Sequence, residues 1–273
     1  MIKYLAPRHQ LTLVSFVRGD QSAEVKHLQQ YCYAVHTVPI ERKIWGDAWA
    51  MLRSLSSGQP WMMVRDDRAA MRQLIDRLAA AEQFDVAHAD QLNMCQYAAR
   101  VPGALKLFDA HNALWVLYQR LAATMSPGPK KWLLERDWHL LKEYEGRICR
   151  EFDAVTAVID EDKTALEEAM RVEPLKVERS NGSSAPRPIE VIPITVDTDE
   201  VSPIKRQSGA DHLVYVGTMY WPPNVDGVLW FAGEVWPLIR AKRPAAQFDV
   251  VGARPPQSVV ALGHEESGIK VAG

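Results

Sequence analysis

Short, largely apolar runs alternate with stretches of helical spacing along most of the chain. Leu11–Val17 is a run of the kind that forms a buried strand, and the polar stretch Gln21–Tyr31 behind it has a helical pattern. That pattern is clearest over Asp66–Ala81, where apolar residues recur at intervals of three and four. Further strands are predicted at Ala34–Ile40, Phe84–His88, Leu105–Phe108, Ala154–Ile159, Ile189–Pro193, Leu213–Val216, Gln247–Val251 and Ile269–Ala272, and further helices at Glu41–Leu55, Ala113–Ala123, Lys130–Arg150 and Val225–Lys242.

The order strand, helix, strand repeats without the turn signals of a β-hairpin. Strands joined in this way cross over right-handed and lie parallel, so the pattern predicts an α/β fold with mostly parallel sheets. A polar run, Asp197–Ser208, separates two sets of strands, and we place a domain boundary there, with domains at 1–200 and 201–273. The segment Glu178–Pro188, rich in Ser, Pro and charged residues, is predicted to be a flexible surface loop.

Composition excludes several classes of protein. The 273 residues are 47% hydrophobic and 24% charged, as in an ordinary globular enzyme, and the net charge of -2 disfavours a nucleic-acid-binding protein. The cysteines Cys32, Cys95 and Cys149 lie far apart, which disfavours disulfides and thiolate metal sites and favours a reducing compartment. The N-terminus lacks the apolar core of a signal peptide, and no stretch approaches the ~20 apolar residues of a membrane span. We therefore expect a cytoplasmic protein, at most in peripheral contact with the inner face of the membrane.

Polar residues gather where predicted strands end, which is where open parallel sheets bind ligands. They are His88 and Asp90, then Asp109, His111 and Asn112, then Gly217 and Thr218, and finally Arg254. His111 is the sharpest candidate, because an imidazole between Asp109 and Asn112 can polarise a reacting group. The alternative is that His111 and Asn112 only cap the helix that follows. His88 and Asp90 offer too few ligands for a metal site, so none is predicted.

The segment LVYVGTMYWPPNVDGVLWF, residues 213 to 231, is the most informative stretch of the chain. Its strand stops at Gly217, a bend passes through Pro222 and Pro223, and a helical pattern opens at Asn224. A glycine turn before a helix N-terminus presents free backbone N–H groups and a partial positive charge, the arrangement that holds the phosphates of a nucleotide. The alternative is an ordinary strand-to-helix turn.

Two further features have a functional and a structural interpretation. Lys130–Arg150 is an amphipathic helix that can rest on an anionic membrane, but its interspersed acidic residues favour a solvated face over a packed core. These acidic residues are Glu135, Asp137, Glu143 and Glu145. The tryptophans Trp45, Trp49 and Trp61 can stack on sugars, although tryptophans at this density more often belong to a core.

The segment from Leu213 closely resembles the start of the nucleotide-sugar half of family 4 (group 1) glycosyltransferases, above all sugar transferases of exopolysaccharide clusters. VIPITVDTD and FDVVGARPP flank it, and HQLTLVSF, FDVAHADQLNMCQY, LFDAHN and FDAVTAVIDED extend the resemblance over nearly the whole chain. The resemblance implies a GT-B fold, with two Rossmann-like parallel-sheet domains facing a cleft. It also implies transfer of a sugar, with retention, from a nucleotide-sugar donor to a polysaccharide or lipid-linked acceptor. No metal and no cofactor would be needed.

The resemblance also assigns roles to the strand-end residues. It makes His111 of DAHN the catalytic histidine on the acceptor side, with His88, Asp90, Asp109 and Asn112 around the acceptor. It gives the donor to the second domain, 201–273, where Gly217, Thr218 and Asn224 would bind it. Asp197-Thr198-Asp199 looks like the metal-binding DxD of another glycosyltransferase fold. Here it ends a segment resembling the interdomain VIPNGVDTD of the metal-independent fold, so we reject that interpretation.

The chain departs from the family pattern at both ends. The helix predicted in MIKYLAPR would follow a first strand and glycine-rich loop that are missing, and Gly273 precedes the place of the family's paired glutamates. Thr218 and Asn224 stand where relatives carry basic residues. We therefore expect a truncated, inactive chain with an incomplete second domain. The alternative function is a catalytically incomplete remnant that binds a ligand or partner. A nucleotide-dependent oxidoreductase or epimerase is weaker, because no dinucleotide fingerprint follows a strand.

Overall fold

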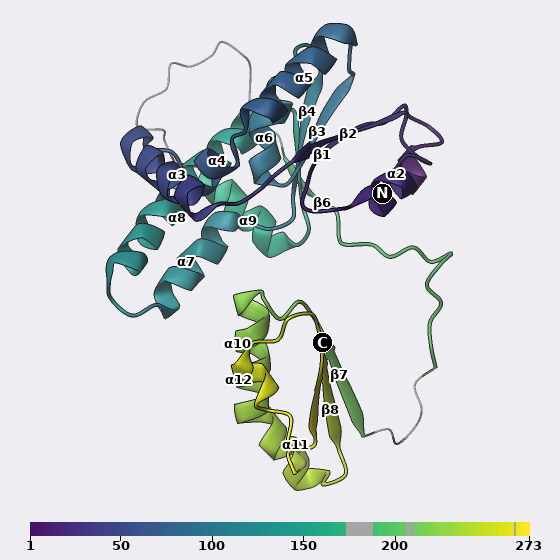
Figure 1. The fold of residues 1–273 in the computed structure, drawn as a ribbon, viewed down its shortest axis with the longest axis vertical. Helices are drawn as coiled ribbons and strands as arrows, with labels where there is room; N and C mark the ends of the chain where they lie inside the picture. Colours follow the sequence, from purple (N-terminus) through teal and green to yellow (C-terminus); the bar gives the residue numbers. More distant parts are fainter. Residues whose placement is uncertain (173–187, 206–208, 210, 265) are drawn as a thin grey trace. The chain divides into compact units, whose positions relative to one another are not determined.

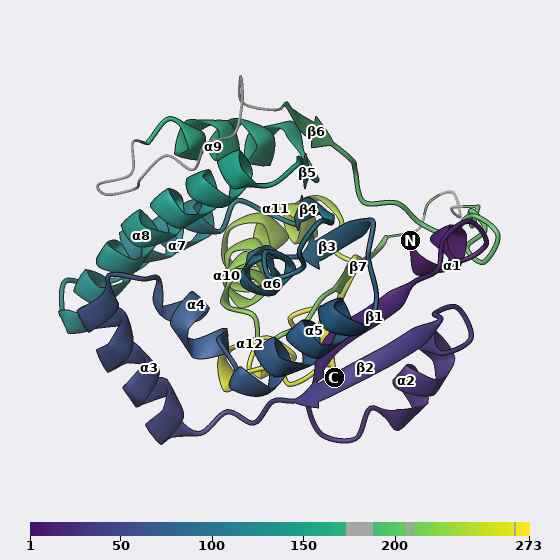
Figure 2. The same ribbon diagram turned by 90° about the horizontal axis from the view of Figure 1, so that it is seen from above.

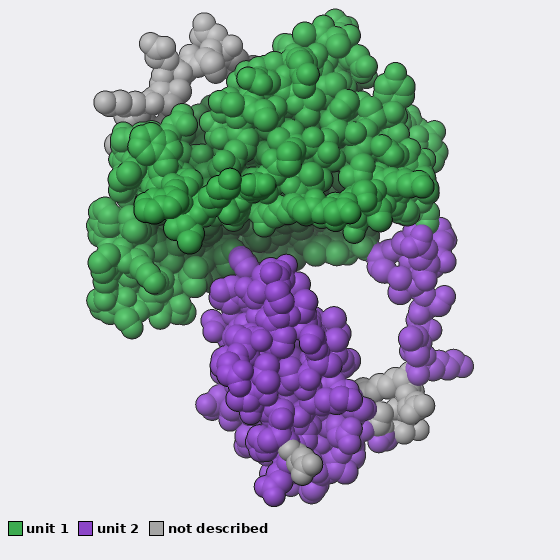
Figure 3. All heavy atoms as spheres, in the orientation of Figure 1, with its two compact units in different colours: residues 1–195 green, residues 196–273 purple. Residues whose placement is uncertain are grey.

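A computed structural model describes residues 1–172, 188–205, 209, 211–264 and 266–273. Apart from Pro188, the predicted surface loop Glu178–Pro188 lies outside these residues. The chain divides into two compact units, 1–195 and 196–273 (Figure 3), whereas the sequence placed the boundary after residue 200. All strand pairs are parallel and helices separate the strands, so the predicted α/β class with parallel sheets is confirmed.

The first unit contains two parallel sheets. One pairs β1 (Thr12–Val17) with β2 (Ala34–Pro39) (Figure 1), and the other runs in the order β3, β4, β5, β6 (Figure 2). Strands of the second sheet are Val86–Asp90, Leu105–Ala110, Ala154–Ala157 and Ile189–Val191. The helices are α1 (Ile2–Leu5), α2 (Ser22–Leu28), α3 (Ile44–Ser57), α4 (Trp61–Asp66), α5 (Ala69–Ala81), α6 (Leu92–Ala98), α7 (Leu114–Thr124), α8 (Pro129–Glu151) and α9 (Asp160–Met170).

The strands β3 to β6 bury one face, and the other face carries polar side chains toward the carboxyl ends of the strands. Successive side chains of a strand point to opposite faces, so Phe108 and Ala110 enter the core while Asp109 lies on the open face. The core side also receives α8, which packs beside α7 and α9 (Figure 2). The open face carries His88, Asp90 and Thr156, each accessible to solvent. The same alternation that builds the core therefore collects the polar side chains on one surface.

The second unit is a three-stranded parallel sheet with helices on one face. Its strands are β7 (His212–Val216), β8 (Gln247–Val251) and β9 (Ile269–Ala272), and its helices are α10 (Pro222–Trp230), a π-helical turn (Phe231–Val235), α11 (Trp236–Lys242) and α12 (Gln257–Val260). Phe248, Val250 and Trp236 form its separate core. On the opposite face Val214 and Val216 are exposed.

The helix predicted over Asp66–Ala81 begins three residues later than expected, at Ala69, and a separate helix precedes it. α4 ends at Asp66 and α5 begins at Ala69, because the buried hydroxyl of Tyr97 holds the chain open between them. That hydroxyl donates to the carbonyl of Asp66 (2.6 Å) and accepts from the N–H of Arg68 (2.7 Å). The bonds replace part of the helical ladder, and a partner about 30 residues away in sequence leaves no mark on local periodicity.

Two expectations about burial were wrong. Asp137 and Glu145 of α8 are buried rather than solvated, and Asp137 accepts the N–H of Trp61 (2.8 Å) at the start of α4. A helix N-terminus leaves its first N–H groups without partners, so a buried carboxylate placed there is stabilised. Trp45 and Trp49, expected in the core, are 86% and 69% exposed on α3, because that helix turns Ala50 and Ser54 inward instead.

Candidate functional site

The strand-end residues of β3 and β4 form one polar cluster in the first unit. The parallel register pairs Asp90 with Asp109, which brings the residues that follow them together. His111 Nε2 lies 2.6 Å from Asp90 Oδ1, and His88 Nε2 lies 3.6 Å from Asp109 Oδ2. The Thr156 hydroxyl donates to Asp109 Oδ1 (2.8 Å) from the next strand. The cluster therefore contains two histidine–carboxylate pairs, open to solvent on the polar face of the sheet.

A strained turn follows Asp90. Gln91 has a φ of 74°, a left-handed conformation that non-glycine residues rarely adopt. Its N–H donates to the carbonyl of Asp109 (3.1 Å), which ties the end of β3 to β4. Backbone strain of this kind costs on the order of 1–3 kcal/mol and concentrates at functional sites. This turn fixes the position of the Asp90 carboxylate that meets His111.

His111 and Asn112 do not cap the helix that follows them, contrary to the structural alternative. The first N–H groups before and within α7 have other partners. Asp162 accepts from Ala113 (2.9 Å), and the two oxygens of Glu145 accept from Leu114 (2.9 Å) and Trp115 (2.8 Å). Since these carboxylates satisfy the start of α7, the side chain of His111 is left to pair with Asp90.

Glu145 was not among the predicted site residues. Burial raises its pKa to about 8, against the opposing effect of the two backbone N–H groups that it accepts. The sequence contained one signal, since Glu145 lies four residues from Leu141 and four from Cys149, on the apolar face of α8. Asp162 and Thr156 carried no such signal, because each contacts the cluster from a separate element.

The cluster gathers more metal ligands than the sequence suggested. Ligand atoms of Asp90, Asp109 and His111 all lie within 4.8 Å of one another, a set of three where the sequence offered only His88 and Asp90. Oxygen and imidazole ligands of this kind suit divalent ions. Each carboxylate already has a protein partner, His111 for Asp90 and Thr156 for Asp109. Metal independence, which the resemblance implies, stays a prediction.

In the second unit the three predicted donor-binding residues meet at one turn. Asn224 of α10 donates through Nδ2 to the carbonyl of Thr218 (3.0 Å) and contacts its hydroxyl (3.4 Å). A Cβ at Gly217 would lie 2.9 Å from the Tyr215 ring and 3.2 Å from Asn224 Nδ2. A larger residue at Gly217 would therefore have to displace these side chains.

The phosphate cradle predicted at this turn is weaker than expected. α10 begins at Pro222 rather than at Asn224, and neither Pro222 nor Pro223 has an N–H to offer. The N–H groups of Asn224 and Val225 donate to the carbonyl of Trp221. Consecutive prolines suit a helix start but remove the donors that a phosphate would use, so a nucleotide would need side chains here.

Arg254 places a positive charge beside this turn. The resembled family carries a basic residue at the position of Thr218 instead. The guanidinium of Arg254 lies over the ring of Tyr220, 4.2 Å from the centroid, and a φ of 57° at Arg254 turns the chain out of β8. The pattern already placed Arg254 at a strand end, but only the structure brings it to Tyr220, two residues after Thr218. A left-handed conformation at a non-glycine residue is again strain beside a candidate site.

Comparison with known proteins adds little to this geometry. No family model matches the sequence, and no curated protein matches it. Among solved structures, the apo structure of OtsA aligns with 92% of this chain and 67% of its own, at 11% identity and a TM-score of 0.44. A similarity of this size carries no argument about function.

The fold and the site thus define a mixed α/β protein with polar clusters at the ends of parallel strands. Within the described residues, no helix combines the length and the apolarity needed to cross a membrane.

Proposed function

We propose that this chain is a glycosyltransferase of GT-B type that moves a sugar from a nucleotide-sugar donor to a polysaccharide or lipid-linked acceptor. The observation that supports this most is the pairing of His111 with Asp90 at the ends of β3 and β4. His111 lies where the resembled family carries its acceptor-side histidine, and in this chain helix capping does not require it. Retention at the anomeric carbon, without metal or cofactor, is part of the proposal.

The cluster has the chemistry that this reaction needs on the acceptor side. An imidazole paired with a carboxylate holds a fixed orientation and can accept or donate a hydrogen bond to a sugar hydroxyl. Asp90 holds His111 through a contact of 2.6 Å, while Asp109 is held by Thr156. Asn112, exposed next to His111, adds an amide that can bind a hydroxyl.

On the donor side, side chains bind the phosphates that backbone N–H groups were predicted to hold. The Thr218 hydroxyl, held by Asn224, can bind a phosphate oxygen, and Arg254 can neutralise its charge. Arg254 thus takes the place of the basic residue that relatives carry after the glycine.

The test is sugar transfer by the full-length protein and by its His111→Ala variant, measured with a panel of nucleotide-sugars. We expect kcat to fall at least ~100-fold, since general acid–base groups contribute about 10²–10⁴. The melting temperature should change little, because His111 is exposed and caps no helix. His9→Ala, another exposed histidine of the first unit, is the matched control and should transfer normally. Near-normal turnover of His111→Ala would refute the catalytic role, and a collapse of its melting temperature would show a structural one.

A binding module without catalysis is the second candidate. The observation that favours it is the start of α10, where two prolines and two bonded N–H groups leave a weak phosphate cradle. The same panel separates the two functions, because a binding module would bind a nucleotide-sugar or an acceptor saturably and transfer nothing. Rates unchanged by a chelator would support metal independence.

For a lipid-linked acceptor we propose peripheral membrane contact through α3 rather than through Lys130–Arg150. The apolar stripe of α8, including Leu141 and Ile148, is buried in the core of the first unit. On α3, by contrast, Trp45, Trp49 and Leu52 share one exposed face. Tryptophans on an amphipathic helix are typical of the membrane interface.

A further inference from the structure

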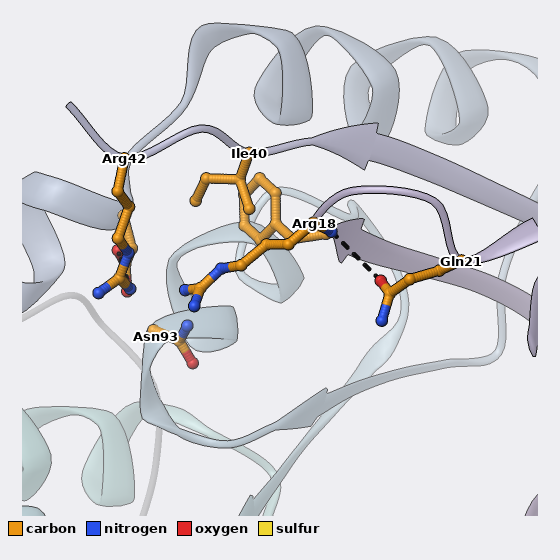
Figure 4. A pocket seen from close by; sticks show the side chains of 7 residues that line it. Arg18, Gln21, Ile40, Arg42 and Asn93 are labelled. Carbon is orange, nitrogen blue, oxygen red and sulfur yellow. Dashed lines mark hydrogen bonds and ion pairs between the residues drawn. The ribbon is translucent and has the colours of Figure 1, made fainter. Parts of the chain in front are cut away.

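A second polar pocket lies in the first unit, at the carboxyl ends of β1 and β2. It has a volume of about 300 Å³ and is lined by residues from both strand ends, from Asp66 of α4 and from Asn93 of α6 (Figure 4). Arg18 directly follows β1, and Arg42 lies just beyond β2. Figure 4 shows their guanidinium groups directed into the same space, with the amide of Asn93 beside them. None of these residues belongs to the His111 cluster.

The charges of this pocket do not balance. Asp66 is buried, and both of its oxygens accept from Arg65, at 3.0 and 3.2 Å, while Arg42 reaches one of them at 3.4 Å. The side chain of Arg18 forms no hydrogen bond or ion pair with any residue that the structure describes. Arg65 and Arg42 thus share Asp66, and Asp47 also acts on Arg42, so these arginines are at least partly neutralised. Arg18 adds a positive charge that no described carboxylate pairs with.

The like charges also affect one another. Burial lowers the pKa of Arg42, and the nearby Arg65 and Arg18 lower it further, with Asp66 and Asp47 opposing them. Positive charges that converge in one pocket repel, and the repulsion is relieved when an anion lies between them. Binding of an anion between these guanidinium groups is therefore favoured.

We propose that this pocket binds the phosphoryl group of the acceptor substrate. Two guanidinium groups from different strands approach from separate directions, with the amides of Gln21 and Asn93 beside them, which suits a tetrahedral group with several acceptor oxygens better than a planar carboxylate. A phosphate monoester carries about −1.5 to −2 charges at neutral pH, so it can pair with Arg18 and with Arg42 together. Phe16 and Ile40 add an apolar wall for the carbon skeleton. Only the assignment to an acceptor rests on the proposed function.

Calorimetric titration of the whole chain with inorganic phosphate and with glycerol 3-phosphate tests the pocket. Arg18→Met should weaken both affinities at least tenfold, and Arg18→Lys should weaken them less, since it keeps the charge without the planar fork. Arg77→Met removes an equal charge from an exposed position of α5 and should change them less than twofold. The melting temperature of Arg18→Met without ligand should not fall, because Arg18 forms no ion pair that the substitution could break.

Four results would overturn the proposal. These are the lack of saturable phosphate binding, an equal loss of affinity in Arg77→Met, tighter binding of glucuronate than of phosphate, and displacement of phosphate by uridine diphosphate in an Arg18-dependent way. The last would assign the pocket to a nucleotide donor instead. Since these titrations need no sugar transfer, they can succeed where the function fails. A full-length protein that transfers no sugar but binds phosphate through Arg18 would refute the glycosyltransferase and leave the anion pocket standing.

Discussion

At the scale of single residues, α8 provides two buried carboxylates that bond the N-termini of other helices. Asp137 accepts from the start of α4, and Glu145 accepts from the start of α7. A buried carboxylate is costly unless it is hydrogen-bonded, and orphan N–H groups at a helix N-terminus are suited to bond it. Glu145 thereby holds the start of α7, which follows His111, through a hydrogen bond to Leu114, 31 residues away in sequence.

The pH dependence of stability should reveal Glu145. Its pKa is raised from 4.5 to about 8 on folding. At a pH between these two values, Glu145 holds a proton in the folded chain that it has lost in the unfolded chain. This contribution is present at low pH and is lost as pH rises through the folded-state pKa. We expect the free energy of unfolding to fall between about pH 5 and about pH 8 by roughly 1–3 kcal/mol more in wild type than in Glu145→Gln.

Urea unfolding at the two pH values measures this difference. Glu151→Gln, at the exposed end of the same helix, should keep the wild-type dependence. Equal pH dependence in wild type and Glu145→Gln would contradict the assignment.

At the scale of elements, the structure reverses what the patterns of α3 and α8 suggested about burial and exposure. α8 packs its apolar stripe between α7 and α9, whereas α3 directs only Ala50 and Ser54 inward and leaves its tryptophans in solvent. Large apolar residues gathered on one exposed helix face are typical of an interaction surface.

Membrane contact through α3 predicts a specific loss. Trp45→Gln with Trp49→Gln should lower partitioning onto anionic lipid vesicles at least about tenfold, because burying each indole contributes about 1.5–3 kcal/mol. Co-sedimentation measures the bound fraction. Trp230→Gln, which alters a tryptophan 62% exposed on α10, is the control and should bind as wild type does. Undiminished binding of the double variant, or no binding by wild type, would rule out this surface.

At the scale of the whole molecule, the two units have separate cores. Leu166 is fully buried in the core of 1–195, and Phe248 belongs to the core of 196–273. A compact unit with its own core can unfold cooperatively by itself.

Calorimetry should therefore show two unfolding transitions that respond to different substitutions. Leu166→Ala should destabilise one unit by about 2–5 kcal/mol, and Phe248→Ala the other by about 3–5 kcal/mol. Leu238→Ala, at an exposed position of α11, should move neither transition appreciably. A single transition shifted alike by both core substitutions would show that the units unfold together.

The sequence by itself determined the order of strands and helices, their parallel pairing and the gathering of polar residues at strand ends. Nearly all strands were predicted within two residues, because strand and helix periodicity is a local property of the chain. Asp90, Asp109 and His111 could be nominated for the same reason, since strand ends in a parallel sheet share one edge.

Only the tertiary structure decided which partners these residues meet. Glu145 at the start of α7, Tyr97 in the break after α4, and Arg18 beside Arg42 are contacts between elements, and periodicity does not encode them. Burial is decided in the same way, which is why Asp137 is inside and Trp45 is outside. Hydrogen bonds and burial depend on residues far apart in sequence, so their energies are fixed only when the elements pack.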